Sequence, residues 1–303
     1  MPPRWTPLSW LPPALRGPAW MVVACVAFAG LWVSIRLASE AMHPMAIVFW
    51  RNLLGLLWLL PMLLATPGLL RLERAPRHLK RATSGLLATY GTFYAVANAP
   101  LATVLAINYT APLFATMGAV LFLGERIRAW RTIALVVGFA GMLLVLRPGA
   151  TAMTPGLWAA VVSALATAVS LVAIKALTAS DDPRAVAAWS FILMLPVSFL
   201  VALPFGAWPD PRLWPILLAL GACAAAGQIS LSQAFAAAEA TAVMPFDFVR
   251  FGLITLAGIL LFGERYDLLT IAGGAVILAS TIFIAVRERL VRSELRPTAP
   301  PDT

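Results

Sequence analysis

This sequence has little charge for its length. Only 12% of its 303 residues are Asp, Glu, Lys or Arg, whereas 61% are hydrophobic. A soluble domain has about a quarter of its residues charged and less than about half apolar. The shortage of charge and the repeated apolar runs therefore place the chain in a lipid bilayer. The net charge of +9 would suggest nucleic acid in a soluble chain, but here we assign it to loops at one membrane face and expect no nucleic-acid partner.

The residue types that carry enzyme chemistry are also scarce. Cys25 and Cys223 fall inside apolar segments without metal-ligand spacing, so we interpret them as packing thiols and expect no metal. His43 and His78 lie in predicted loops, and no Ser-His-Asp or HExxH pattern occurs. A phosphate-binding GxxxxGK[ST] loop is missing too. These absences predict a protein that is not an enzyme, has no cofactor and is not driven by ATP.

The sequence contains instead ten apolar segments. Most hold roughly 18–23 residues, enough for a helix to cross a hydrocarbon core of about 30 Å. Internal prolines do not argue against helices here, because neighbouring helices can satisfy the freed backbone groups. The segments are 19–39, 44–65, 82–99, 101–123, 131–147, 155–177, 185–205, 213–234, 241–262 and 268–286.

Two of these segments end in the same way. One closes in Gly124-Glu125-Arg126 and the other in Gly263-Glu264-Arg265, 139 residues later. The same shift aligns further pairs without a gap, which are Trp50 with Trp189, Arg36 with Lys175, and Asn108 with Asp247. The shared offset indicates that the two halves have a common origin. Because each half would hold five helices, an odd number, the second would enter the membrane the opposite way round, which makes an inverted repeat.

The repeat and the charges predict domains and orientation. With the N-terminus inside the cell, 16 lysines and arginines lie on the cytoplasmic side against 3 outside, a strong positive-inside bias. The inner set includes Arg81, at the end of the basic stretch 66–81. We divide the chain into a cytoplasmic tail at 1–18, a first repeat at 19–149, a second repeat at 150–287, and a second cytoplasmic tail at 288–303.

Three stretches carry a family resemblance. They are PLFATMGAVLFLGERIRAWRTIALVVGFAGMLLVLRPG at 112–149, AIVFWRNLLGLLWLLP at 46–61, and the second Gly-Glu-Arg at 263–265. These stretches resemble the EamA family of the drug/metabolite transporter superfamily, as two EamA domains that cover nearly the whole chain. The resemblance implies an all-α integral membrane protein with ten transmembrane helices in an inverted 5+5 repeat. It also implies a central cavity and secondary transport, without indicating a substrate.

Charges inside the membrane are the first candidates for function, since each costs a few kcal/mol to insert. Asp247 and Arg250 share one helical face at a spacing of i,i+3. Two interpretations stay open: a structural ion pair, or a site where Arg250 holds a carboxylate and Asp247 receives an amine or a proton. Arg51 has no acidic residue in its own segment. It therefore either snorkels toward the outer surface or reaches Asp247 or the substrate.

Uncharged and terminal residues complete the candidates. Asn108, Tyr90, Tyr94, Trp50 and Trp189 could line a cavity for an organic substrate, although aromatic side chains more often pack the core. Ser170, Gln228 and Gln233 could bind a ligand or a neighbouring helix. Gating or structural roles are predicted for four charged residues near helix ends: Arg36, Lys175, Glu125 and Glu264.

The leading prediction is a transporter of a small organic metabolite in a bacterial inner membrane, with both termini cytoplasmic. Transport is secondary or facilitative, and the family resemblance favours export. Arg51, Asp247 and Arg250 sum to a charge of +1, which favours an amino acid or a carboxylate. Its partners would be the substrate and the bilayer, and the protein would be a monomer or a homodimer. Coupling to protons stays open.

Two alternatives stand beside this prediction. The first is a multidrug or organic-cation exporter coupled to protons through Asp247. Its weakness is that the first segment holds no glutamate, because Glu40 lies past its end. The second is a non-transporting sensor or scaffold, which would need no inverted repeat and for which the sequence shows no appended signalling domain.

Overall fold

The computed structural model describes residues 8, 10–66, 68–70, 75–111, 114, 129–146, 153–206, 208–238 and 243–294. These residues form helices and connections, with no strand among them. The helices of the first half are α1 (Pro13–Ala38), α2 (Pro44–Leu64), α3 (Ala75–Asn98), α4 (Leu101–Asn108) and α6 (Ala129–Leu146). Those of the second half are α7 (Pro155–Thr178), α8 (Pro183–Ala202), η1 (Leu203–Phe205), η2 (Pro211–Leu213), α9 (Trp214–Ala237), η3 (Met244–Asp247), α11 (Phe248–Phe262) and α12 (Leu268–Glu294).

Local signals in the sequence explain where several helices begin and end. Helices α2, α7 and α8 each begin at a proline, which has no N–H to lose in the first turn. The preceding residue caps each of them, because His43, Thr154 and Asp182 accept a hydrogen bond from a backbone N–H of the first turn. Helix α11 ends at Gly263, whose φ of 61° is the left-handed conformation that glycine adopts without strain.

Among the described residues, five helices are long and apolar enough to cross a membrane. They are Leu15–Ala38, Pro44–Leu64, Pro155–Thr178, Pro183–Phe205 and Pro211–Ala237. Each of the ten apolar segments of the sequence overlaps at least one helix, but about half of segment 101–123 lies outside the described residues. The all-helical fold is thus confirmed, whereas the full set of ten spans stays a prediction.

Helix α3 begins earlier than its apolar segment, which starts at residue 82. The prediction that His78 lies in a loop is wrong, because both His78 and Arg81 belong to α3 and are only 3% exposed. Next to them in the sequence, Arg77 and Lys80 are exposed. The first turn of α3 is amphipathic, with one face buried and the other exposed. Hydropathy averaged over the whole charged stretch therefore does not reveal this helix.

Two helices are interrupted at places that the offset of 139 makes equivalent. Helix α4 ends at Asn108 and continues into a turn at Tyr109, while the 3₁₀ turn η3 ends at Asp247, where α11 begins. A proline follows or precedes each break in the sequence, at positions 112 and 245. Proline removes a backbone donor and clashes with the preceding turn, which explains why neither segment continues as one straight helix.

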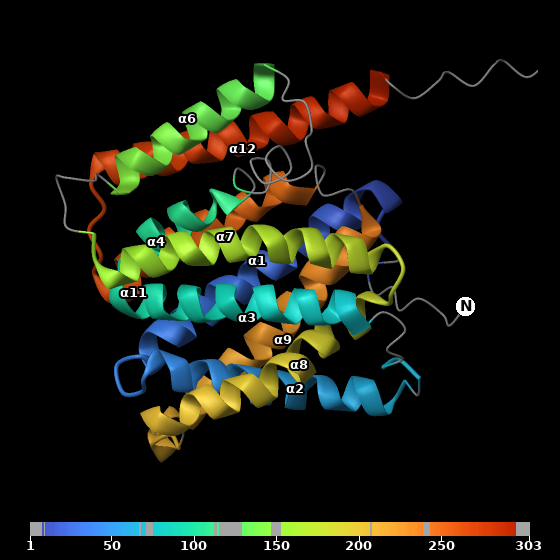
Figure 1. Cartoon of the computed structure of the whole chain (residues 1–303), viewed down its shortest axis with the longest axis vertical. Coiled ribbons are helices and arrows are strands. Elements are labelled where there is room, and N and C mark those ends of the chain that lie inside the picture. The colour runs from blue at the N-terminus through green and yellow to red at the C-terminus, as the bar shows by residue number, and fades with distance from the viewer. Residues whose placement is uncertain are drawn as a thin grey trace, which may run out of the picture.

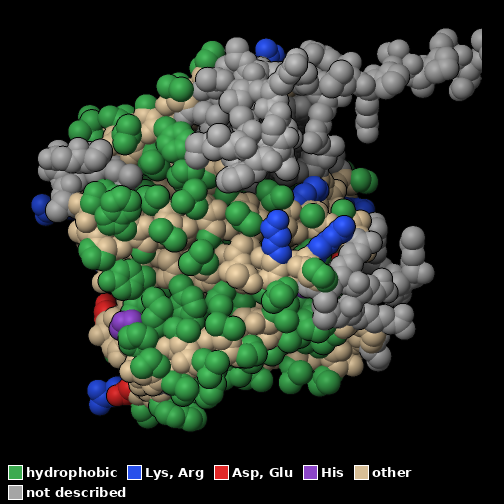
Figure 2. Space-filling view, viewed as in Figure 1, with side chains coloured by type: hydrophobic (Ala, Val, Ile, Leu, Met, Phe, Trp, Pro, Cys, Tyr) green, Lys and Arg blue, Asp and Glu red, His purple; other side chains and the backbone are tan. Residues whose placement is uncertain are grey.

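The helices pack in pairs that follow the repeat. Helix α1 packs along α9, and α3 along α7, and these two pairs exchange when the chain is shifted by 139 residues. Figure 1 shows α6 beside α12 at one side of the bundle, α2 beside α8 at the other, and α3 and α7 between them. Exposed apolar side chains cover the face seen in Figure 2, as expected of a surface in contact with lipid.

Candidate functional site

A cavity of about 180 Å³ lies within the bundle, at the two helix breaks. Helices α1, α2, α3, α7, α8 and α9 supply most of its wall. Its aromatic lining consists of Phe28, Trp32, Phe93 and Tyr109, and its hydroxyl and amide lining of Thr89, Thr92, Asn108, Thr167, Ser170 and Gln228. Four charged side chains also line it, namely Arg51, Arg81, Asp247 and Arg250.

Asp247 and Arg250 form an ion pair on this wall. Arg250 Nη2 donates to Asp247 Oδ2 at 2.7 Å, and the two side chains are 19% and 16% exposed, Arg250 first. The Arg250 guanidinium also lies between two rings, 5.7 Å from the centre of Phe28 and 5.6 Å from that of Tyr109. Its Nε has no hydrogen-bond partner among the described residues. Asp247 and the two rings therefore hold the guanidinium in place, while its Nε–H is still able to donate to a ligand.

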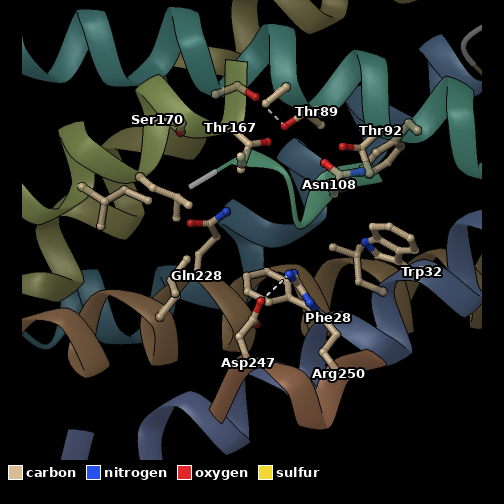
Figure 3. A pocket seen from close by; sticks show the side chains of 18 of the residues that line it. Phe28, Trp32, Thr89, Thr92, Asn108, Thr167, Ser170, Gln228, Asp247 and Arg250 are labelled. Carbon is tan, nitrogen blue, oxygen red and sulfur yellow. Dashed lines mark hydrogen bonds and ion pairs between the residues drawn. The ribbon is translucent and has the colours of Figure 1, made fainter. Parts of the chain in front are cut away.

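The two helix breaks are joined by a hydrogen bond. The Tyr109 hydroxyl, one residue beyond α4, donates to the backbone oxygen of Asp247 at 2.7 Å. Asn108 accepts from the Ser163 hydroxyl at 3.1 Å and donates to the Val104 carbonyl at 3.0 Å. Figure 3 shows Asp247 and Arg250 on one side of the cavity, with a group of hydroxyl and amide side chains opposite: Thr89, Thr92, Asn108, Thr167 and Ser170.

Arg51 reaches the same cavity from α2. It is 3% exposed, its Cζ lies 4.7 Å from the ring centre of Phe191, and its Nη1 donates to Asn52 Oδ1 at 2.7 Å. This burial argues against the snorkelling interpretation, which needs the guanidinium in water. Arg81, which the charge pattern had placed in a cytoplasmic stretch, faces the cavity too and donates to Gln228 Oε1 at 3.3 Å.

Four of the predicted aromatic residues do not belong to the lining of this cavity. Tyr90 and Tyr94 are partly buried on α3, one position beyond Thr89 and Phe93, which do line it. One residue turns a helix by about 100°, so this displacement moves them to another face. Trp50 packs edge-on against Trp214 at 5.2 Å. The last of the four, Trp189, lies 6.1 Å from the His78 ring.

The predicted gating residues lie near helix ends. Arg36 Nη1 donates to the carbonyls of Val96 at 2.7 Å and Ala99 at 3.2 Å. At the same end Glu264 accepts from the backbone N–H of Leu101 at 2.9 Å, lies 3.8 Å from Arg36, and accepts from the Tyr266 hydroxyl. Glu264 thus caps α4.

The opposite end of the bundle holds the partner of Arg36 in the repeat. Lys175 Nζ donates to the carbonyls of Phe235 at 2.7 Å and Ala238 at 2.9 Å. Glu125, the predicted counterpart of Glu264, lies outside the described residues. For Arg36, Lys175 and Glu264 the structure therefore shows hydrogen bonds that fasten helix ends, and it places none of the three on the cavity wall.

Some cavity residues escaped sequence reasoning. Phe28, Trp32, Thr89, Thr92 and Thr167 look like ordinary membrane-helix residues, since no charge marks them. Arg81 carried a usable signal: buried His78, Arg81 and Gly85 follow the helical spacing of i, i+3 and i+7. Its basic neighbours concealed that spacing.

A bundle of apolar helices around a polar, charged cavity at two helix breaks defines a membrane transport protein. The model of the EamA-like transporter family matches residues 15–147 and 154–286, and the chain belongs to this family.

Similar proteins in several bacteria are transporters. A riboflavin transporter of Rhizobium johnstonii is 33% identical over 94% of this chain and 95% of its own. The pseudopaline exporter CntI of Pseudomonas aeruginosa is 33% identical over 87% and 94%, respectively. An S-adenosylmethionine uptake transporter of Rickettsia bellii is 26% identical over 92% and 96%. These relatives are named as transporters, which confirms the prediction that the chain is not an enzyme.

The fold itself occurs in a solved structure. One crystal structure of a protein matches with a TM-score of 0.64 and 19% identity, over 91% of this chain and 98% of that one. The likeness supports the fold alone, since an identity this low carries no information about substrate.

Proposed function

We propose that this protein is a secondary transporter that moves an amino acid, or another small metabolite with a carboxylate, across a bacterial inner membrane. The observation that carries the proposal is the Asp247–Arg250 pair on the cavity wall. The fork of a guanidinium matches the two oxygens of a carboxylate, and Asp247 can receive an amine or a proton. A zwitterion would satisfy both members of the pair at once.

Movement would follow from the repeat. The proposal includes ten spanning helices in an inverted 5+5 arrangement, with the two halves rocking about the breaks at Asn108 and Asp247. The equivalent helix pairs α1–α9 and α7–α3 support such a relation between the halves. The halves differ at the breaks themselves, where one holds a neutral amide and the other an ion pair.

The direction and driving force are part of the proposal. Export is the direction that we propose, with both termini in the cytoplasm, as the positive-inside bias predicts. We propose a proton as the coupling ion. A proton on Asp247 would neutralise that carboxylate and weaken its pairing with Arg250, which would change how Arg250 binds the carboxylate of a substrate. A coupled pair of this kind makes binding depend on pH without any cofactor.

The lining disfavours the alternative of an organic-cation exporter. Among the described residues that line the cavity, three arginines face one aspartate, and that aspartate is already paired. A cation would have to displace Arg250 within a field that is positive on balance. The same positive field would attract an anionic substrate or the carboxylate of a zwitterion.

A second candidate substrate is a flat heterocycle such as riboflavin. Phe28, Trp32 and Tyr109 line the cavity with aromatic rings that such a molecule could contact, and a riboflavin transporter is among the relatives given above. The hydroxyl and amide side chains opposite could bind its polar edge. This candidate does not need the ion pair to bind a carboxylate, so the two can be separated by experiment.

The test is counterflow in proteoliposomes loaded in turn with amino acids, dicarboxylates, riboflavin and S-adenosylmethionine. We expect saturable counterflow of at least one carboxylated substrate, and its loss in Asp247→Asn. Asp210→Asn is the matched control, because Asp210 is exposed and its oxygen cap on Arg212 N–H survives the change. Transport of riboflavin alone, unaffected by Asp247→Asn, would favour the second candidate. Counterflow of none of these compounds would contradict the proposed function.

A further inference from the structure

Two arginines face the cavity, and neither has a carboxylate partner among the described residues. Arg51 comes from α2 and Arg81 from α3, and each is 3% exposed. Both approach Met194: Arg51 Nη1 lies 3.9 Å from its sulfur, and a Cβ added at Gly85 would meet both Met194 Cε and Arg81 Nη1. Their side-chain partners among the described residues are neutral: Asn52 and Met194 for Arg51, and Gln228 for Arg81. Two buried positive charges therefore share one region of the wall.

Several N–H donors of these two guanidinium groups remain available for a ligand. Arg51 Nε, Arg81 Nε and Arg81 Nη1 are buried and have no hydrogen-bond partner among the described residues. A buried guanidinium is strongly unfavourable unless an anion or good acceptors compensate it. An oxyanion supplies both, because its charge offsets the positive charges and its oxygens accept from the two forks.

The surroundings hold both guanidinium groups in position. Arg51 stacks on Phe191, and its partner Asn52 is fixed in turn by donating to the Ser198 hydroxyl at 3.0 Å. Arg81 Nη1 occupies the space above Gly85, where an added Cβ would lie 2.0 Å from it. Glycine at this position thus makes room for the guanidinium. Such positioning is typical of a binding site.

We infer that Arg51, Arg81 and Gln228 form a subsite for an oxyanion of the transported metabolite, either a carboxylate or a phosphate. This subsite is distinct from the Asp247–Arg250 pair, which other helices supply. Gln228 projects into the cavity (Figure 3). Its Oε1 accepts from Arg81 Nη2 and so orients that guanidinium. The inference rests on the proposed function, and it adds that the substrate carries an anionic group at the end bound by α2 and α3.

The first test measures anion binding and needs no knowledge of the substrate. The melting temperature of the full chain in phosphatidylcholine nanodiscs is followed against phosphate, sulfate and acetate, with chloride at equal ionic strength as reference. We expect a saturable rise with the oxyanions. Arg51→Gln and Arg81→Gln should each weaken the apparent affinity about tenfold or more. Arg212→Gln, at an exposed arginine, should leave it unchanged.

The melting temperatures of the same variants also show whether each variant is folded. Because each Gln variant removes an unpaired buried charge, its melting temperature in chloride should equal or exceed that of the wild type. If a Gln variant does not fold, Arg51→Lys or Arg81→Lys takes its place, since lysine keeps the charge and loses the fork. Oxyanion binding that is absent in the wild type, or that survives in the variants of both arginines, would overturn the inference.

The second test asks whether the oxyanion belongs to the substrate. Riboflavin is compared with riboflavin 5′-phosphate, and glutamate with glutamine, since each pair differs in one anionic group. We expect tighter binding of the anionic member of at least one pair, and loss of that preference in Arg81→Gln. Equal binding within both pairs, with inorganic oxyanions still bound, would assign the subsite to a free anion and overturn the inference. Loss of all counterflow with this preference intact would instead contradict only the proposed function.

Discussion

Arg36 and Lys175 make the same pair of hydrogen bonds in the two halves of the chain. Each donates to backbone carbonyls 60 and 63 residues further on, Arg36 at the end of α3 and Lys175 at the end of α9. The last carbonyls of a helix have no partner within it, and they carry the negative end of its dipole. An identical solution at an offset of 139 residues supports a duplicated unit, and it gives both cations a structural task.

That task can be tested by removing each cation. We expect Arg36→Met and Lys175→Met each to lower the free energy of unfolding by about 1–3 kcal/mol, because two charge-assisted hydrogen bonds are lost. The losses should be similar in the two variants. Chemical unfolding in detergent measures them, with exposed Arg212→Met as the control. Full stability of Arg36→Met together with lost transport would contradict the structural role.

Variants of the Asp247–Arg250 pair should separate the contribution of the pair to stability from its role in transport. Asp247→Asn leaves Arg250 without its carboxylate, at a cost of about 3 kcal/mol in the free energy of unfolding. The double change Asp247→Asn and Arg250→Met removes both charges, so it should recover most of that stability. Counterflow should stay absent in both proteins. A double variant that transports as well as the wild type would show that the pair is only structural.

Close approach of α2 and α9 depends on a glycine. A Cβ at Gly221 would lie 2.5 Å from Leu54 Cβ and 2.9 Å from the Leu54 backbone carbon, which cannot move aside. We expect Gly221→Ala to lower the melting temperature, with a destabilisation of about 1–3 kcal/mol. Gly252→Ala is the matched control, because a Cβ added there would have nothing within 4 Å of it and alanine favours the helix. Equal melting temperatures for the two variants would contradict this account of the packing.

Tyr266, in the connection between α11 and α12, should make stability fall at high pH. Burial and its hydrogen bond to Glu264 raise the pKa of Tyr266 above the ordinary value of about 10. Above about pH 10 the unfolded chain loses this proton while the folded protein keeps it, so the free energy of unfolding decreases as pH rises. Tyr266→Phe cannot titrate and should show a shallower decrease. Unfolding at about pH 9 to 11 measures the difference, and identical slopes would contradict the assignment.

Much of the site could be predicted because charge is rare in this chain. Arg51, Asp247 and Arg250 stand out in apolar segments, and the offset of 139 leads from Asp247 to Asn108. All four residues line the cavity. Their role in binding stays a prediction, but their convergence follows from the cost of leaving such groups in lipid.

Other predictions could not succeed from sequence alone. Tyr90 and Tyr94 were candidates by their type and spacing, yet α3 presents Thr89 and Thr92 to the cavity instead. Periodicity shows that a helix has faces, but it does not say which face meets a cavity when both are apolar. Arg81 was hidden for the opposite reason, since charge on all sides of it resembled a loop.

Composition and repetition along the chain by themselves determined that this is a helical membrane protein of duplicated origin, and they marked its intramembrane charges. The membrane class and the scarcity of intramembrane charge follow from hydration energy, which acts on each residue whatever its helix contacts. The duplicated origin follows from the shared offset of 139 residues. Only the tertiary structure decided that Arg51 and Arg81 line one cavity with neutral side-chain partners among the described residues, and that Arg36 and Lys175 fasten helix ends. The rotation of a helix about its axis is set by how its small residues fit its neighbours, and that fit exists only once the helices are packed.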